Sequence, residues 1–173
     1  MSDVISNFRF EGYKVDRIKY ETIPDLQFLK TTGTLAPEGW IFEIAMRQPL
    51  FLKKEKKYVG GMEMIIKYPL SKEMLDELHK LSDKKEGTSL ESIKDIVKLE
   101  IGIAGIFSVE EGRFDKNTEE NLVKIQIPML LFPYLRSTVT SIFAHGGLGS
   151  FLFPLINVQE LAKKASLQIQ EIE

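Results

Sequence analysis

Two histidines and scattered carboxylates are the side chains of this chain that could transfer protons or hold a metal ion. His79 and His145 lie far apart in the sequence. The chain has no cysteine, which excludes disulfides, thiolate chemistry and cysteine-based zinc sites within it. The acidic pairs at 110–111 and 119–120 stand where turns and helix starts are expected, and there they serve as caps and solvated residues. We therefore expect no catalytic residues, no metal site and no cofactor, and we expect that the protein is not an enzyme.

The remaining polar motifs predict no nucleotide or nucleic-acid site. Residues 146–149 are rich in glycine, but they follow a predicted helix and no Lys-Ser or Lys-Thr pair comes after them, so they fit a phosphate-binding loop poorly. The charged run at 53–57 is most simply a solvated hairpin tip. The 23 basic and 25 acidic residues are nearly balanced, which argues against a general nucleic-acid-binding surface.

Apolar side chains are abundant in segments that need not be buried. Loops usually run over the surface and are polar, yet the segment between the two predicted helices is apolar, as are residues 50–52. These side chains either fill the core beneath a loop or line a groove that accepts unfolded polypeptide. The residues of the inter-helix segment are Leu148, Phe151, Leu152, Phe153, Leu155 and Ile156.

Alternating apolar residues predict four strands. The Gly60-Gly61 pair has two interpretations. It is either a two-residue hairpin turn, or it lies inside the third strand while residues 53–57 form the turn. The expected strands are 8–23, 40–46, 58–68 and 96–109.

Two helices are predicted after the strands. The first begins at Asn117, which can form a capping box with Glu120, and runs to residue 146, bent around Pro128 and Pro133. The second begins at 157, where Asn caps with Glu at 160, and its apolar positions are Leu161, Ala165 and Ile169. This order predicts an α+β fold, a four-stranded antiparallel sheet with two C-terminal helices packed on one face.

Three blocks of sequence resemble the preprotein-export chaperone SecB. Residues 131–147 are similar to its first long helix, residues 105–109 to the Gly-Ile-Phe-Ser-Ile at the end of its last strand, and residues 157–161 to the start of its second helix. The blocks keep the order and approximate spacing of that family. The matching positions in the first block are Leu131, Phe132, Pro133, Tyr134, Arg136, Thr140, Ser141 and Gly146.

The resemblance implies one SecB-like domain over residues 1–173, and it favours the turn at 53–57 with Gly60-Gly61 inside the third strand. SecB joins its third and fourth strands by a short turn, so residues 71–92 look like an insertion. Those residues have helical spacing ringed by charges, which suits a surface helix, a lid or a partner-docking element. The first residues lack the basic and apolar regions of a signal peptide, and no uninterrupted apolar run approaches the ~20 residues of a membrane helix. We therefore expect a soluble, cytoplasmic protein without membrane insertion.

The resemblance further implies an ATP-independent chaperone, a holdase for protein export and translocation that binds unfolded or precursor polypeptides in hydrophobic grooves. SecB forms a homotetramer, a dimer of dimers, by edge-strand pairing and by packing of its first helix. The small residues Ser137, Thr138 and Ser141 are the candidate oligomer face here, although they equally suit packing within one chain. The candidate client-binding residues are Trp40, Phe42, Ile44, Phe107, Leu148, Phe151 and Phe153.

The chain also departs from the SecB pattern. The segment at 147–156 differs in sequence, and the long polar tail that helps many SecB proteins to dock the translocase motor SecA is missing. SecA therefore stands only as an implied partner. Two alternatives remain open beside export: a dedicated chaperone for one client, such as an antitoxin, and a SecB-like interaction or ligand-binding module without holdase activity.

Overall fold

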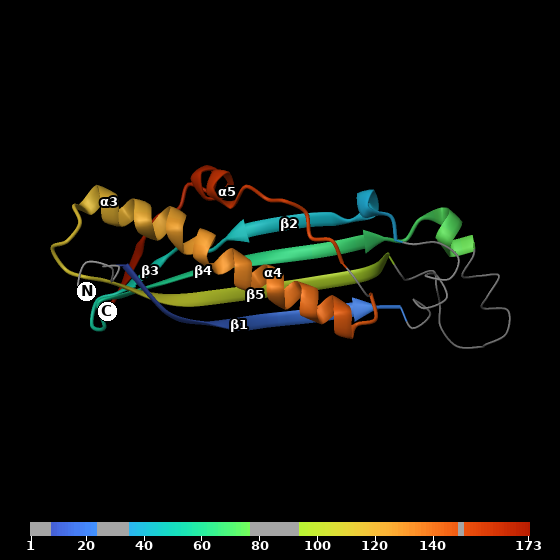
Figure 1. Ribbon diagram of the computed structural model, residues 1–173, viewed down its shortest axis with the longest axis horizontal. Helices are drawn as coiled ribbons and strands as arrows, with labels where there is room; N and C mark the ends of the chain where they lie inside the picture. Colours follow the sequence, from blue (N-terminus) through green and yellow to red (C-terminus); the bar gives the residue numbers. More distant parts are fainter. Residues whose placement is uncertain (1–7, 24–34, 77–93, 149–150) are drawn as a thin grey trace, which may run out of the picture. The chain divides into compact units, whose positions relative to one another are not determined.

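Residues 8–23, 35–76, 94–148 and 151–173 of the chain are described by a computed structural model, and their strands form one sheet (Figure 1). The sheet has six strands in the order β1-β5-β4-β3-β6, and β2 also pairs with β4. Every expected strand is present, but the expectation of a four-stranded sheet is wrong, because two short strands extend it. The strands are β1 (Phe8–Thr22), β2 (Ile41–Met46), β3 (Leu50–Leu52), β4 (Lys57–Pro69), β5 (Asp95–Val109) and β6 (Gln170–Ile172).

The chain divides into two compact units, and β1, β4 and β5 continue from one unit into the other. The helices α3, α4 and α5 and the surfaces described below belong to unit one. The expected insertion at 71–92 falls mostly on residues 77–93, outside the described residues; residues 72–76 at its start are helical. Unit one comprises Met1–Arg17, Ile44–Glu63 and Ile101–Glu173, and unit two comprises Ile18–Glu43 and Met64–Glu100.

The charged run after β3 forms the turn into β4. The two strands pair antiparallel, with Leu52 opposite Lys57. Lys56 in the turn adopts a left-handed φ of 54°. Gly60 and Gly61 therefore lie inside β4, which confirms the interpretation favoured from the sequence.

Two glycines let α4 (Ile127–His145) lie close to the sheet in unit one (Figure 1). A Cβ atom added at Gly60 would collide with Cγ2 of Ile127, and one added at Gly105 would lie 2.7 Å from Cδ2 of Leu131. The buried stripe of α4 recurs every four residues, as expected for a helix with one face on a core. Its members are Ile127, Leu131, Leu135, Val139 and Phe143.

The first helix is capped by Asp115 and not by the predicted Asn117. Oδ1 of Asp115 accepts hydrogen bonds from the backbone N–H groups of Asn117 and Thr118, at 3.1 and 3.0 Å. Hydrogen bonds from Thr118 are the main cause of the lowered pKa of the Asp115 carboxyl. A carboxylate at this position satisfies free N–H groups and complements the helix dipole. The helix α3 spans Lys116–Asn121.

α3 continues into a π-helical turn, Leu122–Gln126, and then directly into α4. Pro128 in the first turn of α4 has no N–H to donate to the carbonyl four residues earlier. We attribute the wider π turn just before Pro128 to this missing bond, because such turns shift the hydrogen-bond register by one residue. Pro133 lies inside α4, so both prolines fall within the helix as expected.

Lys116–His145 is long and apolar enough, by length and composition, to cross a membrane. The sequence prediction missed it because it counted only uninterrupted apolar residues. The core helix of a soluble protein meets the same criterion, and here Ile127 and Leu131 pack against the sheet. The finding is therefore weak evidence for a membrane span.

The second helix, α5 (Val158–Lys164), is shorter than expected. Its predicted cap is confirmed, because Oδ1 of Asn157 accepts a hydrogen bond from the N–H of Glu160 at 3.0 Å. Ser166 then takes a left-handed φ of 48°, and the chain becomes extended. The prediction that Ile169 lies on this helix is wrong, because α5 ends at Lys164 and the chain then leads into β6 at the sheet edge.

Candidate polypeptide-binding surface

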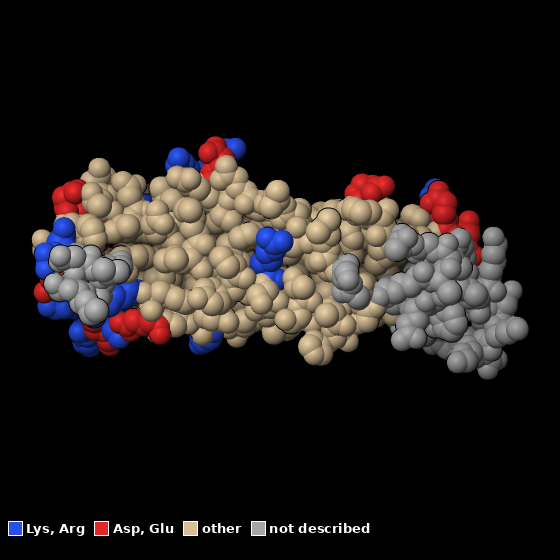
Figure 2. Space-filling model, viewed as in Figure 1, with Lys and Arg blue, Asp and Glu red and all other residues tan. Residues whose placement is uncertain are grey.

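The outward face of α4 is apolar and carries almost no charge. Met129, Leu130 and Tyr134 are exposed on it, and Arg136 is the only Lys, Arg, Asp or Glu of the helix. The space-filling view shows few charged groups over α4 (Figure 2). An exposed apolar face of this kind is typical of a surface that contacts another polypeptide.

The segment after α4 packs its phenylalanines against that helix. Phe151 lies edge-on to Phe143, with ring centroids 4.7 Å apart, and Phe153 lies edge-on to Phe132 at 5.8 Å. Phe151 and Phe153 also contact each other at 6.0 Å. The Arg136 guanidinium lies over the Phe153 ring, 5.7 Å from its centroid, which adds a cation–π attraction. We call these four phenylalanines the loop cluster; they hold the segment on α4.

Two leucines of the same segment point away from the loop cluster. Leu152 is 84% exposed and Leu155 is 95% exposed, whereas Phe153 is only 4% exposed. Side chains of extended chain alternate in direction, so burial of Phe151 and Phe153 turns Leu152 between them to solvent. The phenylalanines are predicted from the sequence as client-binding residues, whereas the two leucines are not. Alternation with Phe151 and Phe153 explains the exposure of Leu152 but not that of Leu155, whose position has the same parity as the two phenylalanines.

The other predicted client-binding residues lie in different surroundings. Phe107 is 0% exposed and stacks with Phe8 and Phe10 at 5.5 and 5.1 Å. Trp40, in unit two, packs edge-on against Tyr68 at 5.1 Å. Phe151 and Phe153 are thus the pair that the structure visibly brings together, and Phe107 can only support a binding surface from beneath. Phe42, Ile44 and Leu148 are half-buried, and their role in binding stays a prediction.

The predicted oligomer face borders a hollow on α4. Ser137 and Ser141 are exposed and Thr138 is half-buried. The Thr138 hydroxyl donates a hydrogen bond to the Tyr134 carbonyl at 2.9 Å, so it is already satisfied within the helix. The small side chains leave a cavity of about 380 Å³ in which a larger partner side chain could fit. The cavity is lined by Phe132, Pro133, Arg136, Ser137, Thr140 and Ser141.

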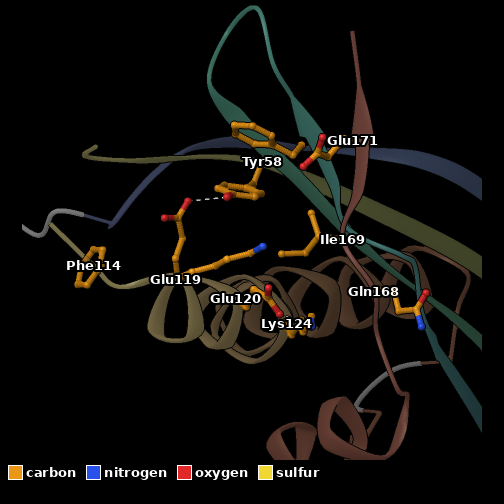
Figure 3. Close-up of a pocket in the computed structure, with 10 residues that line it drawn as sticks. Tyr58, Phe114, Glu119, Glu120, Lys124, Gln168, Ile169 and Glu171 are labelled. Carbon is orange, nitrogen blue, oxygen red and sulfur yellow. Dashed lines mark hydrogen bonds and ion pairs between the residues drawn. The ribbon is translucent and has the colours of Figure 1, made fainter. Parts of the chain in front are cut away.

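A second pocket, of about 530 Å³, lies between the first helix and the strand edge at β6 (Figure 3). The Tyr58 hydroxyl donates a hydrogen bond to Glu119 at its wall. The pKa of Tyr58 lies far above its usual range, mainly because the phenol is buried and also because it is hydrogen-bonded to Glu119. The phenol therefore stays protonated and cannot act as a base. Among the described residues, no group of three His, Cys, Asp or Glu side chains could hold a metal ion. The pocket therefore offers polar and apolar contacts to a binding partner.

The family model of SecB, preprotein translocase subunit SecB, matches residues 65–168 of the chain. A similar solved structure is the SecB-like chaperone Rv1957 of Mycobacterium tuberculosis, in complex with a ChAD peptide from the HigA1 antitoxin Rv1956. The two share 9% sequence identity with a TM-score of 0.56, over 87% of this chain and 91% of that chain. The curated proteins give no match. Since the family model covers more than half of the sequence and the fold agrees, this chain belongs to the SecB family, a family of chaperones.

Proposed function

We propose that this protein is an ATP-independent holdase, which binds unfolded or non-native polypeptide on the segment at 151–156 that packs beside α4. The observation that carries the proposal is the almost complete exposure of Leu152 and Leu155 beside the packed rings of the loop cluster. A soluble protein gains nothing for its own fold from two leucines held in water. They are well placed to bury apolar side chains of a client.

The proposed binding needs no nucleotide, because its free energy comes from removing apolar surface from water. That term is about 25 cal/mol per Å² of apolar area, and ordering costs leave only modest affinity for one short segment. A long unfolded client can engage several such surfaces at once, and linked binding raises the overall affinity by orders of magnitude. A folded client hides its apolar segments and is ignored.

Fluorescence anisotropy with a labelled, slow-folding polypeptide tests the holdase proposal. The polypeptide is titrated in its unfolded and its folded form, without nucleotide. We expect the unfolded form to bind at least about tenfold more tightly, because only it exposes apolar segments. Equal affinity for both forms, or no binding to either, would contradict a general holdase.

We further propose that the protein is a homotetramer that uses the outward face of α4. The hollow beside Pro133 and the exposed apolar side chains Met129, Leu130 and Tyr134 support packing of a second helix there. Light scattering should then give a mass near four times the 19.8 kDa of one chain. Ser137→Arg should dissociate the assembly by filling the hollow with a charge, whereas Gln159→Arg on the exposed side of α5 should not. A wild-type monomer at micromolar concentration would rule this out.

A dedicated chaperone for one client is the second candidate. The similar mycobacterial protein was solved with a peptide from an antitoxin, which favours a single client over many. The anisotropy experiment separates the two candidates, because a dedicated chaperone should ignore the generic unfolded polypeptide and co-purify with one protein. Recovery of many precursors that carry signal peptides would instead support protein export as the setting.

A further inference from the structure

The segment after α5 adds itself to the sheet as an extra strand. β6 pairs in parallel with β3, with Leu50 beside Gln170. The N–H of Gln170 donates to the carbonyl of Pro49 at 2.8 Å, and the N–H of Lys53 donates to the carbonyl of Ile172 at 3.0 Å. All three residues of β6 are exposed. The edge of β3 therefore accepts an extended polypeptide through backbone hydrogen bonds, and the segment that occupies it is exposed to solvent.

The pocket beside this edge also contacts side chains of the added segment, Gln168 among them. Ile169 and Glu171 line the pocket, whereas Gln170 between them does not. Figure 3 shows both side chains coming from the same segment of chain at the edge of the pocket. Backbone pairing with a sheet edge, combined with a pocket for every second side chain, is a recurring mode of peptide recognition.

The charges at the pocket suit an acidic residue at the position of Glu171. Nζ of Lys53 lies 2.7 Å from its carboxylate, and Lys116 also lines the pocket. The pKa of Glu171 is lowered, mainly by its hydrogen bond to Lys53 and least by the charge of Lys116. The carboxylate therefore stays charged. Other charges of the pocket pair among themselves, as Lys124 does with Glu120 at 2.9 Å. Removing the segment would leave Lys53 without this partner and the pocket ready for another carboxylate.

We propose that the edge of β3 and its pocket form a strand-acceptor site for client polypeptide. The preferred client segment is extended and has an apolar residue followed two positions later by an acidic one, as in Ile169 and Glu171. Residues 168–172 occupy the site in the free protein, and a client must displace them. The inference rests on the proposed holdase function, since it names a second client site and its preference.

The test uses the full chain and a labelled peptide with the sequence of residues 166–173. Gln170→Pro removes the N–H that bonds to Pro49, and Gln170→Ala is the matched control that keeps it. A tethered segment competes at roughly millimolar effective concentration, so its release should raise affinity for the peptide by about tenfold relative to the control. A peptide with the Glu171→Lys change should bind about fivefold more weakly, because it would face Lys53 and Lys116 with a like charge.

Glu171→Lys in the full chain is the second variant, since this side chain is 62% exposed and its replacement should not prevent folding. It too should raise peptide binding. No gain in either variant, or equal affinity for both peptides, would overturn the proposal. If Gln170→Pro loses its oligomers without a gain in peptide binding, the edge of β3 contacts a second copy of the chain. This outcome would also overturn the strand-acceptor proposal.

The same preparations are titrated with the generic unfolded polypeptide, which separates the two proposals. In one outcome the wild-type protein binds the unfolded polypeptide, but the variants show no gain in affinity for the short peptide. This outcome would support the holdase proposal and contradict the strand-acceptor site. A gain for the short peptide without any binding of unfolded polypeptide would support the site and contradict the holdase.

Discussion

Replacing Leu152 and Leu155 together with aspartate is expected to lower the affinity for unfolded polypeptide by at least about tenfold, since burial of one leucine side chain contributes about 1.5–3 kcal/mol. The two side chains are 84% and 95% exposed and stabilise nothing within the chain. The free energy of unfolding should therefore stay within about 0.5 kcal/mol of wild type, as for other surface substitutions. Anisotropy measures the first quantity and denaturant unfolding the second.

Ile18→Asp is the matched control for the leucine variant. Ile18 is also an exposed aliphatic residue, at 55%, but it belongs to β1 in unit two and not to the 151–156 segment. It should leave client affinity unchanged. If the leucine variant binds unfolded polypeptide as well as the control does, the segment is not the client surface.

The neighbouring phenylalanines cannot serve for this test. Phe153 is 4% exposed and packs against Phe132 and Arg136. Aspartate at position 153 would bury an unpaired carboxylate, which is among the most destabilising changes known. Lost binding in such a variant would report unfolding of the segment and not the removal of a client contact.

The sequence predicts the parts of this fold whose signals are local. The alternation of β4 and β5 and the Asn157 cap each depend on a few neighbouring residues, whereas the choice of 53–57 as the hairpin turn comes from the resemblance to SecB. Local signals also predict the helix through Pro128 and Pro133, because the apolar stripe continues past both prolines.

The features that the sequence does not predict depend on tertiary contacts. Ile169 continues the helical spacing of Leu161 and Ala165, and only the free edge of β3 draws that segment into a strand. Leu152 and Phe153 are equally apolar, so the outward one is known only once Phe132 and Phe143 have taken their places on α4. The site is therefore predictable as a segment, but the residues that it exposes are not.

Gly60→Ala is expected to destabilise the fold by about 2–3 kcal/mol, because overpacking in a filled core costs about 1–3 kcal/mol and here the added atom meets a branched side chain directly. The new Cβ would collide with Cγ2 of Ile127, which is fully buried between α4 and the sheet. Either the helix lifts from β4 or Ile127 leaves its preferred rotamer. For a chain of this size the melting temperature should fall by about 4–12 °C.

A double-mutant cycle shows whether that collision is the cause. Ile127→Ala removes the colliding methyl and alone should cost about 2–5 kcal/mol through the cavity that it leaves. In the double variant the alanine at position 60 fills part of this cavity, so the combined loss should be smaller than the sum of the single losses by at least about 1 kcal/mol. Additive losses in urea unfolding would mean that Gly60 is required for a reason other than the close approach of α4. A coupled result would instead locate the contact that holds the helix, and with it the proposed client surface, on the sheet.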